Sequence, residues 1–210
     1  LLWPSNRGDW LPYLFVLVGE AILLAHALFA MWTILSSDYN PRGVAYYRAK
    51  EQLFSAREIE QTDTKYSPWE WRMHIAGKPV DIEVFITTFH EPIAVIRKTV
   101  LAAMTMVGRH RTWLLDDGDS DEVRDLAKET GARYVRRFSK NGAKAGNLNY
   151  ALTLAKAPFF LILDADFIPE PTLLTPMMPF FATKNVAFGQ GPQVFGIRHH
   201  LISRAAGYRL

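Results

Sequence analysis

The sequence contains no cysteine among its 210 residues, so disulfide bonds and thiolate metal sites are excluded. Its formal net charge is only +3, so the composition gives no indication of nucleic-acid binding. No Gly-x-Gly-x-x-Gly follows the first predicted strand, which disfavours a dinucleotide-dependent dehydrogenase. No Gly-x-x-x-x-Gly-Lys-Ser/Thr occurs either, which disfavours a P-loop nucleotide hydrolase.

Residues 11–35 lack lysine and arginine and are long enough to cross a bilayer as a helix. Trp10 and Trp32 lie near the ends of this segment, where interfacial aromatic residues are common. A buried core helix of a soluble protein is the alternative interpretation. Glu20 and His26 would be polar groups at membrane depth, so we expect this helix to pack against others rather than to cross alone.

The distribution of basic residues predicts the orientation of this segment. One arginine precedes it and several basic residues follow it, namely Arg7 before and Arg42, Arg48, Lys50 and Arg57 after. The positive-inside rule then places residues 36 onward in the cytoplasm, and we expect the inner (plasma) membrane. Residues 42–60 form either a helix on the membrane surface or a solvated connector, and we favour the connector. The predicted organisation is a transmembrane segment (1–36), a juxtamembrane connector (37–78) and an α/β domain (79–210).

From residue 79 onward, predicted strands alternate with predicted helices. The strands are expected at residues 80–86, 112–115, 133–138 and 159–163. The helices are expected from Glu91-Pro92 to Met104, from 121 to 130 after the capping residue Ser120, and from 149 to 156. This alternation predicts an α/β fold with a doubly wound, mostly parallel sheet, preceded by the transmembrane helix.

The fourth predicted strand ends in two carboxylates, Asp164 and Asp166. If the strand continues, both lie on one face, because side chains two residues apart in a strand do so. Paired carboxylates at a strand end suit a hard divalent cation, which in turn can hold a diphosphate. The alternative is a polar strand end before a turn at Pro169.

Polar residues also follow the other predicted strands. Since right-handed crossovers bring the ends of parallel strands to one edge, we expect a single ligand cleft there. The residues concerned are Thr87, Thr88, His90 and Glu91 after the first strand, Asp116 and Asp117 after the second, 141–149 after the third, and Asp164 and Asp166 after the fourth. We expect the side chain of Asp117 to be exposed.

Five segments, in this order, resemble the cellulose-synthase-like branch of the family-two glycosyltransferases. They are residues 84–92 (VFITTFHEP), 115–118 (LDDG), 143–149 (AKAGNLN), 163–166 (LDAD) and 191–195 (GPQVF). His90 departs from the family, which usually has asparagine at this position. Gly191 stands where the family has threonine in the segment that forms an acceptor-side wall with Gln193 and Phe195.

The resemblance implies a GT-A type fold, a UDP-sugar donor (UDP-glucose) and Mg²⁺ or Mn²⁺. It implies that Asp117 recognises uracil and that Thr87 and Glu91 line the uridine pocket. It also implies that Lys144 lies near the nucleotide, that Asp164 lies beside the donor sugar and diphosphate, and that Asp166 binds the metal together with Asp164. On this basis Asp117 and Asp164 are the candidate catalytic residues.

The implied activity is that of a membrane-bound inverting glycosyltransferase that extends a β-linked polysaccharide such as β-glucan or cellulose. The expected partners are the nucleotide sugar, the growing polysaccharide, membrane lipid and further membrane or envelope subunits. No Thr-Glu-Asp motif for the general base and no Gln-x-x-Arg-Trp motif for the acceptor is found. We therefore expect donor binding by an N-terminal portion of a longer enzyme. The alternatives are transfer of a single sugar to a lipid and a non-catalytic nucleotide-sugar-binding module.

Overall fold

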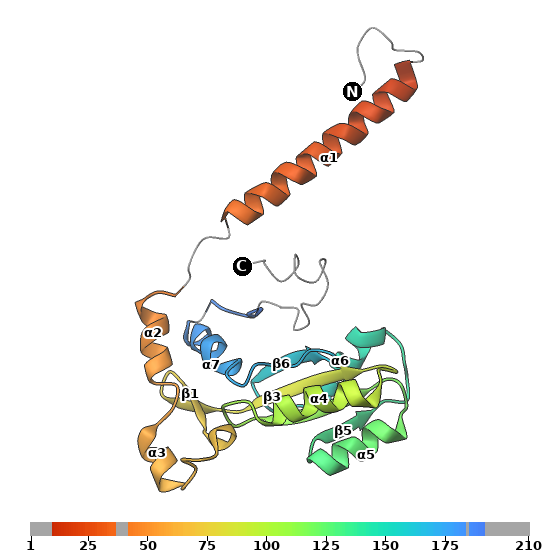
Figure 1. Cartoon of the computed structure of the whole chain (residues 1–210). Coiled ribbons are helices and arrows are strands. Elements are labelled where there is room, and N and C mark those ends of the chain that lie inside the picture. Colours follow the sequence, from red (N-terminus) through yellow and green to blue (C-terminus); the bar gives the residue numbers. More distant parts are fainter. Residues whose placement is uncertain (1–9, 37–41, 184, 192–210) are drawn as a thin grey trace, which may run out of the picture. The chain divides into compact units, whose positions relative to one another are not determined.

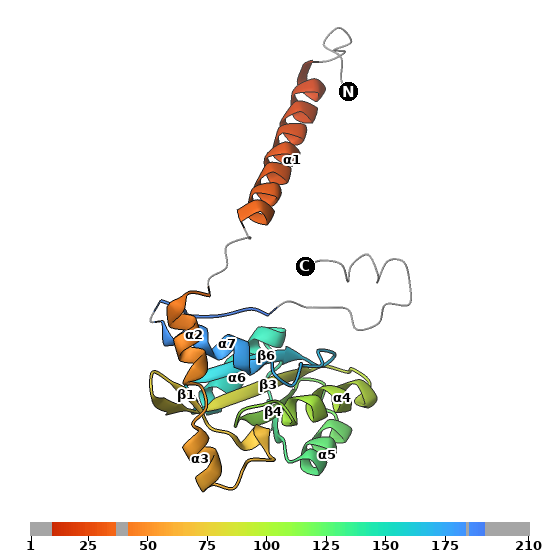
Figure 2. The same ribbon diagram turned by 60° about the vertical axis from the view of Figure 1, so that its left-hand side comes forward.

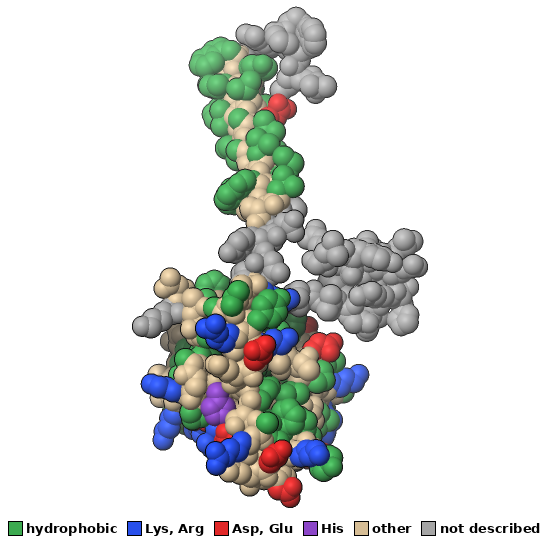
Figure 3. All heavy atoms as spheres, turned by 90° about the vertical axis from the view of Figure 1, so that its left-hand side faces the viewer, with side chains coloured by type: hydrophobic (Ala, Val, Ile, Leu, Met, Phe, Trp, Pro, Cys, Tyr) green, Lys and Arg blue, Asp and Glu red, His purple; other side chains and the backbone are tan. Residues whose placement is uncertain are grey.

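The computed structural model describes residues 10–36, 42–183 and 185–191, which form two compact units that divide after Gly43. The first unit contains one helix, α1 (Trp10–Ser36) (Figure 1). Figure 3 shows hydrophobic side chains over most of its visible surface. The segment Trp10–Thr33 has a mean hydropathy of 2.2 and none of it is buried within the described structure. By length and composition, α1 can therefore cross a membrane.

The second unit is an α/β domain (Figures 1 and 2). Its helices are α2 (Val44–Glu51), α3 (Ala56–Gln61), α4 (Ile93–Met104), α5 (Asp121–Thr130), α6 (Ala143–Leu154) and α7 (Leu174–Met177), with short 3-10 helices η1 (Pro68–Glu70) and η2 (Met178–Ala182). Its strands are β1 (Met73–Ile75), β2 (Lys78–Val80), β3 (Ile82–Thr88), β4 (Arg111–Asp116), β5 (Arg133–Arg136) and β6 (Phe159–Asp164).

The main sheet has the strand order β5-β4-β3-β6, and all neighbouring strands are parallel. The predicted α/β fold with a parallel sheet is therefore confirmed. β1 and β2 form a separate antiparallel hairpin. Its turn contains Ala76 at φ 50° and Gly77 at φ 74°, as two-residue hairpin turns require. The first predicted strand, 80–86, is consequently split between β2 and β3.

The other predicted boundaries of strands and helices lie close to the observed ones, except at the start of α6. The third strand ends at Arg136 rather than at residue 138. The predicted helix 149–156 is wrong at its start, because α6 already begins at Ala143. Helix α5 has the predicted bounds, with Ser120 accepting a hydrogen bond from the amide of Val123 (3.4 Å) and Gly131 in the left-handed conformation after its last turn.

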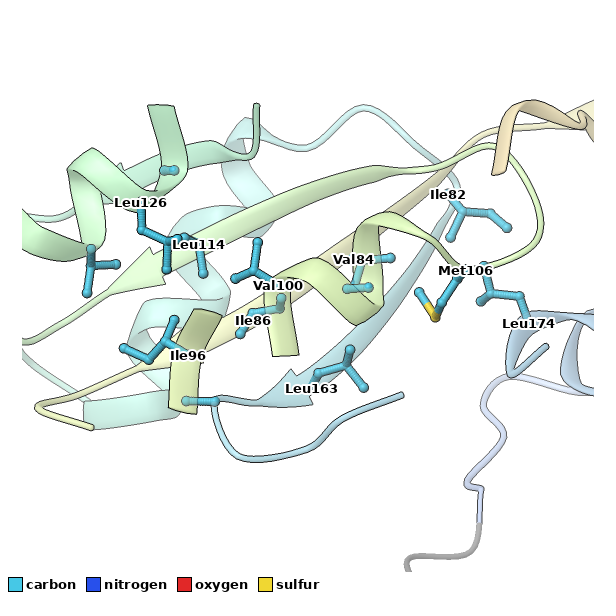
Figure 4. Packing of buried hydrophobic residues seen from close by; sticks show 14 of the residues in the cluster. Ile82, Val84, Ile86, Ile96, Val100, Met106, Leu114, Leu126, Leu163 and Leu174 are labelled. Atoms are coloured by element: carbon cyan, nitrogen blue, oxygen red, sulfur yellow. The ribbon is translucent and has the colours of Figure 1, made fainter. Parts of the chain in front are cut away.

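Both faces of the sheet are covered, by α4 and α5 on one side and by α6 on the other (Figures 1 and 2). Alternate residues of each strand point to opposite faces. Ile82, Val84 and Ile86 of β3 therefore join the larger core beneath α4, which Figure 4 shows. Phe85 points the other way and packs in a second cluster with Trp113. The sheet is thus held between two apolar layers, and its strand ends are fixed in place.

Residues that precede the sheet pack on the same domain. The hydroxyl of Tyr46 in α2 donates to the carbonyl of Pro176 (3.1 Å). Leu53 and Met73 are fully buried in the larger core. The division of the chain into segments 1–36, 37–78 and 79–210 stays a prediction.

Candidate functional site

The parallel strands bring their carboxyl ends to one side of the sheet, which we call the carboxyl edge. It consists of the ends of β3, β4, β5 and β6 and the residues that follow them. Thr88 is paired with Asp116, Asp116 with Arg136, and Thr87 with Asp164. The strand pairing therefore places Thr87, Thr88, Asp116 and Asp164 next to one another at this edge.

Asp116 has a structural role at this edge. Its side chain is 1% exposed. Its carboxylate accepts hydrogen bonds from the amides of Gly118 and Ser120 (both 2.8 Å) and from the hydroxyl of Tyr134 (2.7 Å). Burial and the bond to Asp116 raise the pKa of Tyr134 to about 12. Asp116 thus shapes the turn from β4 into α5.

Asp117 is buried, so the expectation that its side chain is exposed was wrong. Both of its carboxylate oxygens accept from the guanidinium of Arg137, at 2.7 Å from Nε and 2.7 Å from Nη2. The hydrogen bond to Asp117 raises the pKa of Arg137 above its ordinary value. This fork fixes the plane of the carboxylate. Arg137 follows β5, which lies beside β4, and this adjacency is what brings the two side chains together.

Arg137 and Lys140 also hold the turn that leads into α6. Arg137 donates to the carbonyls of Asn141 (2.6 Å) and Ala143 (2.8 Å). Lys140 donates to the carbonyl of Asp117 (2.7 Å) and to the carboxylate of Asp119 (2.8 Å). The hydrogen bond from Lys140 lowers the pKa of Asp119 below its ordinary value.

Gly146 lies in the first turn of α6, where there is no room for a side chain. A Cβ at this position would lie 2.0 Å from the carbonyl oxygen of Asn141 and 2.6 Å from Nη1 of Arg137. The close approach of α6 to the preceding turn therefore requires glycine. This contact positions Lys144, two residues earlier, at the carboxyl edge.

Lys144 forms an ion pair with Asp164 across the edge, between α6 and β6. Thr87 of β3 reaches the same carboxylate oxygen of Asp164 at 3.4 Å. Strand β6 ends at Asp164, and Asp166 lies in the turn that follows, where its side chain is exposed. The continuous strand that would put both carboxylates on one face is therefore absent at Asp166.

Glu91 and His90 shape the loop after β3. The carboxylate of Glu91 accepts from the amide of Phe89 (2.6 Å), so it is folded back onto its own loop. His90 has φ 64°, a left-handed conformation. Asparagine and histidine are both enriched in this conformation, which accounts for histidine where the resembling family has asparagine.

The donor set at this edge suits a hard divalent cation that is shared with a substrate. No group of three or more histidine, aspartate or glutamate side chains suited to a metal exists in the described ranges. Asp164 and Asp166 supply two carboxylates, and Mg²⁺ is commonly held by one or two carboxylates together with substrate phosphates and water. The residues therefore fit a metal that binds together with a diphosphate.

A hollow of about 490 Å³ lies at the opposite edge of the sheet, among α3, η1 and the residues before β4. Trp69 and Trp71 line it. None of the candidate site residues is among its lining. At the carboxyl edge, the ion pair between Lys144 and Asp164 joins α6 to the end of β6.

Some functional candidates lie elsewhere or were not anticipated. Gln193 and Phe195 lie outside the described residues. Arg137 and Lys140 were not identified from the sequence, and Asn147 was included only as part of the range 141–149. Two consecutive arginines at a strand end, next to a strand ending in two aspartates, are the signal for Arg137. Asn147 is buried and its amide donates to the carbonyl of Leu115 (3.0 Å), which ties α6 to β4.

Comparison with known proteins gives a consistent result. The profile of glycosyl transferase family 2 matches residues 83–204. Together with the parallel sheet, this match confirms the GT-A type α/β fold expected from the sequence.

The cellulose synthase catalytic subunit [UDP-forming] of Xanthomonas axonopodis pv. citri (strain 306) is 40% identical over 118 residues, covering 54% of this chain and 16% of that protein. The cellulose synthase 1 catalytic subunit [UDP-forming] of Komagataeibacter xylinus is 35% identical over 139 residues, covering 61% of this chain and 18% of that protein.

The chain thus spans less than a fifth of the length of these curated relatives. Among solved structures, the mannosyltransferase PcManGT from Pyrobaculum calidifontis, in complex with GDP-Man and Mn²⁺, aligns with 79% of this chain and 44% of that chain. The identity is 20% and the TM-score 0.47, a likeness too slight to carry an argument.

Proposed function

Because the chain belongs to glycosyl transferase family 2, we propose that its carboxyl edge binds a nucleotide-diphosphate sugar, UDP-glucose, for transfer to a growing β-linked polysaccharide. The observation that carries this proposal is the convergence of Thr87, Asp117, Lys144 and Asp164 at one edge of the sheet. Open α/β sheets bind their ligands at this edge. The names of the two cellulose synthase relatives, both described as UDP-forming, support the choice of uridine.

Asp117 is suited to read the base. Each carboxylate oxygen has two lone pairs, and Arg137 occupies one on each. Acceptor capacity therefore remains for the N3–H of uracil. Cytosine carries a lone pair at N3 and would be repelled by the same carboxylate. Thr87 and Glu91, on β3 and the loop after it, complete the proposed uridine pocket.

The diphosphate is proposed to lie between α6 and β6. The N-terminus of a helix favours anions, and α6 begins at this edge with Lys144 in its first turn. Lys144 is then drawn from Asp164 to the phosphates. Asp164 and Asp166 would hold Mg²⁺ or Mn²⁺. A cation held there would supply positive charge that stabilises the leaving nucleoside diphosphate, so that the bond between the sugar C1 and the diphosphate oxygen could break without protonation of the leaving group.

The membrane setting is also part of the proposal. Its basis is the apolar helix α1 and the excess of arginine and lysine after it. We place the α/β domain in the cytoplasm at the inner (plasma) membrane. The partners would be the nucleotide sugar, the growing polysaccharide, membrane lipid and other membrane or envelope subunits.

Calorimetric titration of the full chain in detergent micelles tests donor binding. UDP, CDP and GDP are compared with Mn²⁺ and with EDTA. We expect UDP to bind best and its affinity to fall in EDTA, because two carboxylates would otherwise face the diphosphate unscreened. Equal affinity for all three nucleotides would contradict the proposed uridine site, and equal affinity in EDTA would contradict the metal role.

The polymer product requires a second experiment. Membranes that carry the natural protein are incubated with radiolabelled nucleotide sugars, and any polymer is digested with linkage-specific glucanases. A long β-linked glucan supports the proposal. A singly glycosylated lipid, or binding with no product, would instead favour the transfer of one sugar or a non-catalytic binding module.

A further inference from the structure

We propose that Arg137 is a positioning residue for donor recognition. It holds the carboxylate of Asp117 and the turn that carries Lys144 as one preformed unit, without contacting the nucleotide. This inference rests on the proposed function, because Asp117 and Lys144 are the donor-binding residues assumed there. It adds the residue that directly follows β5 to a site otherwise described by β3, β4, α6 and β6.

The hydrogen bonds of Arg137 reach both halves of the site. Nε and Nη2 each donate to one oxygen of Asp117 at 2.7 Å. Nη1 donates to the carbonyl of Asn141 at 2.6 Å, and Nη2 to that of Ala143 at 2.8 Å. One guanidinium therefore links the base-reading carboxylate to the backbone directly before Lys144.

Arg137 has little capacity left for a ligand. A guanidinium has five N–H donors, and the four hydrogen bonds above use four of them. Its side chain is only 6% exposed. A residue that is buried and has four of its five donors engaged in this way acts through the groups it holds.

The geometry depends on the shape of the guanidinium. A lysine supplies a point charge on a flexible stem and cannot reproduce a planar fork that donates to a carboxylate and to two carbonyls. The turn is also packed closely against the guanidinium, since a Cβ on Gly146 would lie 2.6 Å from Nη1. Charge alone should therefore not replace Arg137.

The first test compares Arg137→Lys with a matched control, Arg97→Lys. Arg97 also forms a fork with a carboxylate, that of Glu129, but it joins α4 to α5 on the surface and takes no part in the site. Titration with UDP and CDP in the presence of Mn²⁺ is the readout. We expect Arg137→Lys to lower UDP affinity roughly tenfold or more. CDP affinity should fall less, so that the preference for UDP narrows, while Arg97→Lys leaves both affinities unchanged.

Hydrogen exchange distinguishes positioning from general destabilisation. In the wild type, the amides of Ala143 and Gly146 donate within the turn, to the carbonyls of Lys140 and Gly142. In Arg137→Lys these amides should exchange faster, while amides of β3 and β4 keep their protection. Faster exchange throughout the sheet would show that Arg137 serves the fold alone and would overturn the inference.

A double-mutant cycle tests whether Arg137 acts through Asp117. Asp117→Asn, Arg137→Gln and the double variant are titrated with UDP and CDP. If Arg137 works by orienting Asp117, the double variant should have the same UDP preference as Asp117→Asn. Additive losses of preference would overturn the inference. If the wild type itself shows no preference for UDP over CDP, the proposed function fails. If the wild type prefers UDP and Arg137→Lys keeps that preference in full, only the role of Arg137 is contradicted.

Discussion

Two adjacent carboxylates, Asp116 and Asp117, have different environments and therefore different roles. Asp116 receives two backbone amides and a tyrosine hydroxyl, and these donors satisfy its charge within the fold. Among the described residues, only Arg137 donates to the carboxylate of Asp117, which leaves lone pairs on both oxygens. Asp116 thus takes the structural role in the turn that contains Gly118. Asp117 remains available for recognition.

Gly146 provides a prediction at the level of one side chain. In Gly146→Ala the new methyl group would meet the carbonyl of Asn141 and the guanidinium of Arg137. Overpacking of this kind costs about 1 to 3 kcal/mol, and the turn that positions Lys144 would have to shift. We expect lower stability in urea unfolding and weaker UDP binding. The neighbouring variant Ala145→Ser, at an exposed position, is the control and should change neither.

Asp166 provides a prediction about the metal. Its side chain is exposed in a turn, so Asp166→Asn should change the free energy of unfolding by less than about 0.5 kcal/mol. It should nevertheless remove most of the gain in UDP affinity that Mn²⁺ provides, because one of only two carboxylate ligands is lost. Asp81→Asn, at an exposed position before β3 on the opposite edge, is the matched control. An unchanged response to Mn²⁺ in Asp166→Asn would remove this residue from the metal site.

At the level of elements, the sequence predicts the helices and strands whose position is marked by neighbouring residues, such as apolar runs and capping residues. Strands β3, β4 and β6 contain apolar runs, and α5 has a capping serine and a terminal glycine, so these elements were found with small errors. Helix α6 starts after Gly142, which has φ 77° and offers no side-chain cap. Because glycine in this conformation usually ends a helix, local rules place the start of α6 too late.

The residues of the candidate site were predicted only where local patterns in the sequence mark them. The strand ends fix Thr87, Asp117 and Asp164, and these follow from the alternation of strands and helices. The bond between Asp117 and Arg137 joins residues 20 positions apart and depends on β5 lying beside β4. Strand order is a tertiary property, and a single sequence read locally does not contain it.

The junction of β4, α5 and β5 carries a pH prediction. Tyr134 keeps its proton in the fold up to a pKa of about 12, because burial and Asp116 disfavour the phenolate. An unfolded tyrosine loses its proton at about pH 10. Between these values the unfolded chain binds fewer protons than the fold, so the stability present below about pH 10 should decrease as the pH rises toward 12.

Urea unfolding across this range measures the effect. Tyr134→Phe should lower stability near neutral pH by about 1.5 to 3 kcal/mol, since Asp116 loses a donor, and should flatten the alkaline decline. Tyr66→Phe, which alters a side chain that is 84% exposed, is the control and should keep the wild-type slope. The same slope in Tyr134→Phe would mean that other groups cause the decline.

At the level of the whole molecule, the polar residues of α1 bear on its surroundings. Glu20 and His26 are both exposed on α1 within the described structure. Each would be costly in contact with lipid. If α1 spans the membrane, we therefore expect other helices to cover these two side chains.

The orientation of α1 gives the prediction on which the proposed cytoplasmic donor site depends. Nucleotide sugars are made in the cytoplasm, and the excess of basic residues after α1 predicts that the α/β domain lies on that side. The chain has no native cysteine, so single cysteines report their own accessibility. The cysteine that reports on the α/β domain is placed at Lys128 of α5, whose side chain is 70% exposed. Ser120 is avoided because it caps the same helix. In intact cells an impermeant thiol reagent should label Ser5→Cys but not Lys128→Cys, and permeabilisation should expose both. Labelling of Lys128→Cys alone in intact cells would reverse the topology and remove the domain from its proposed donor.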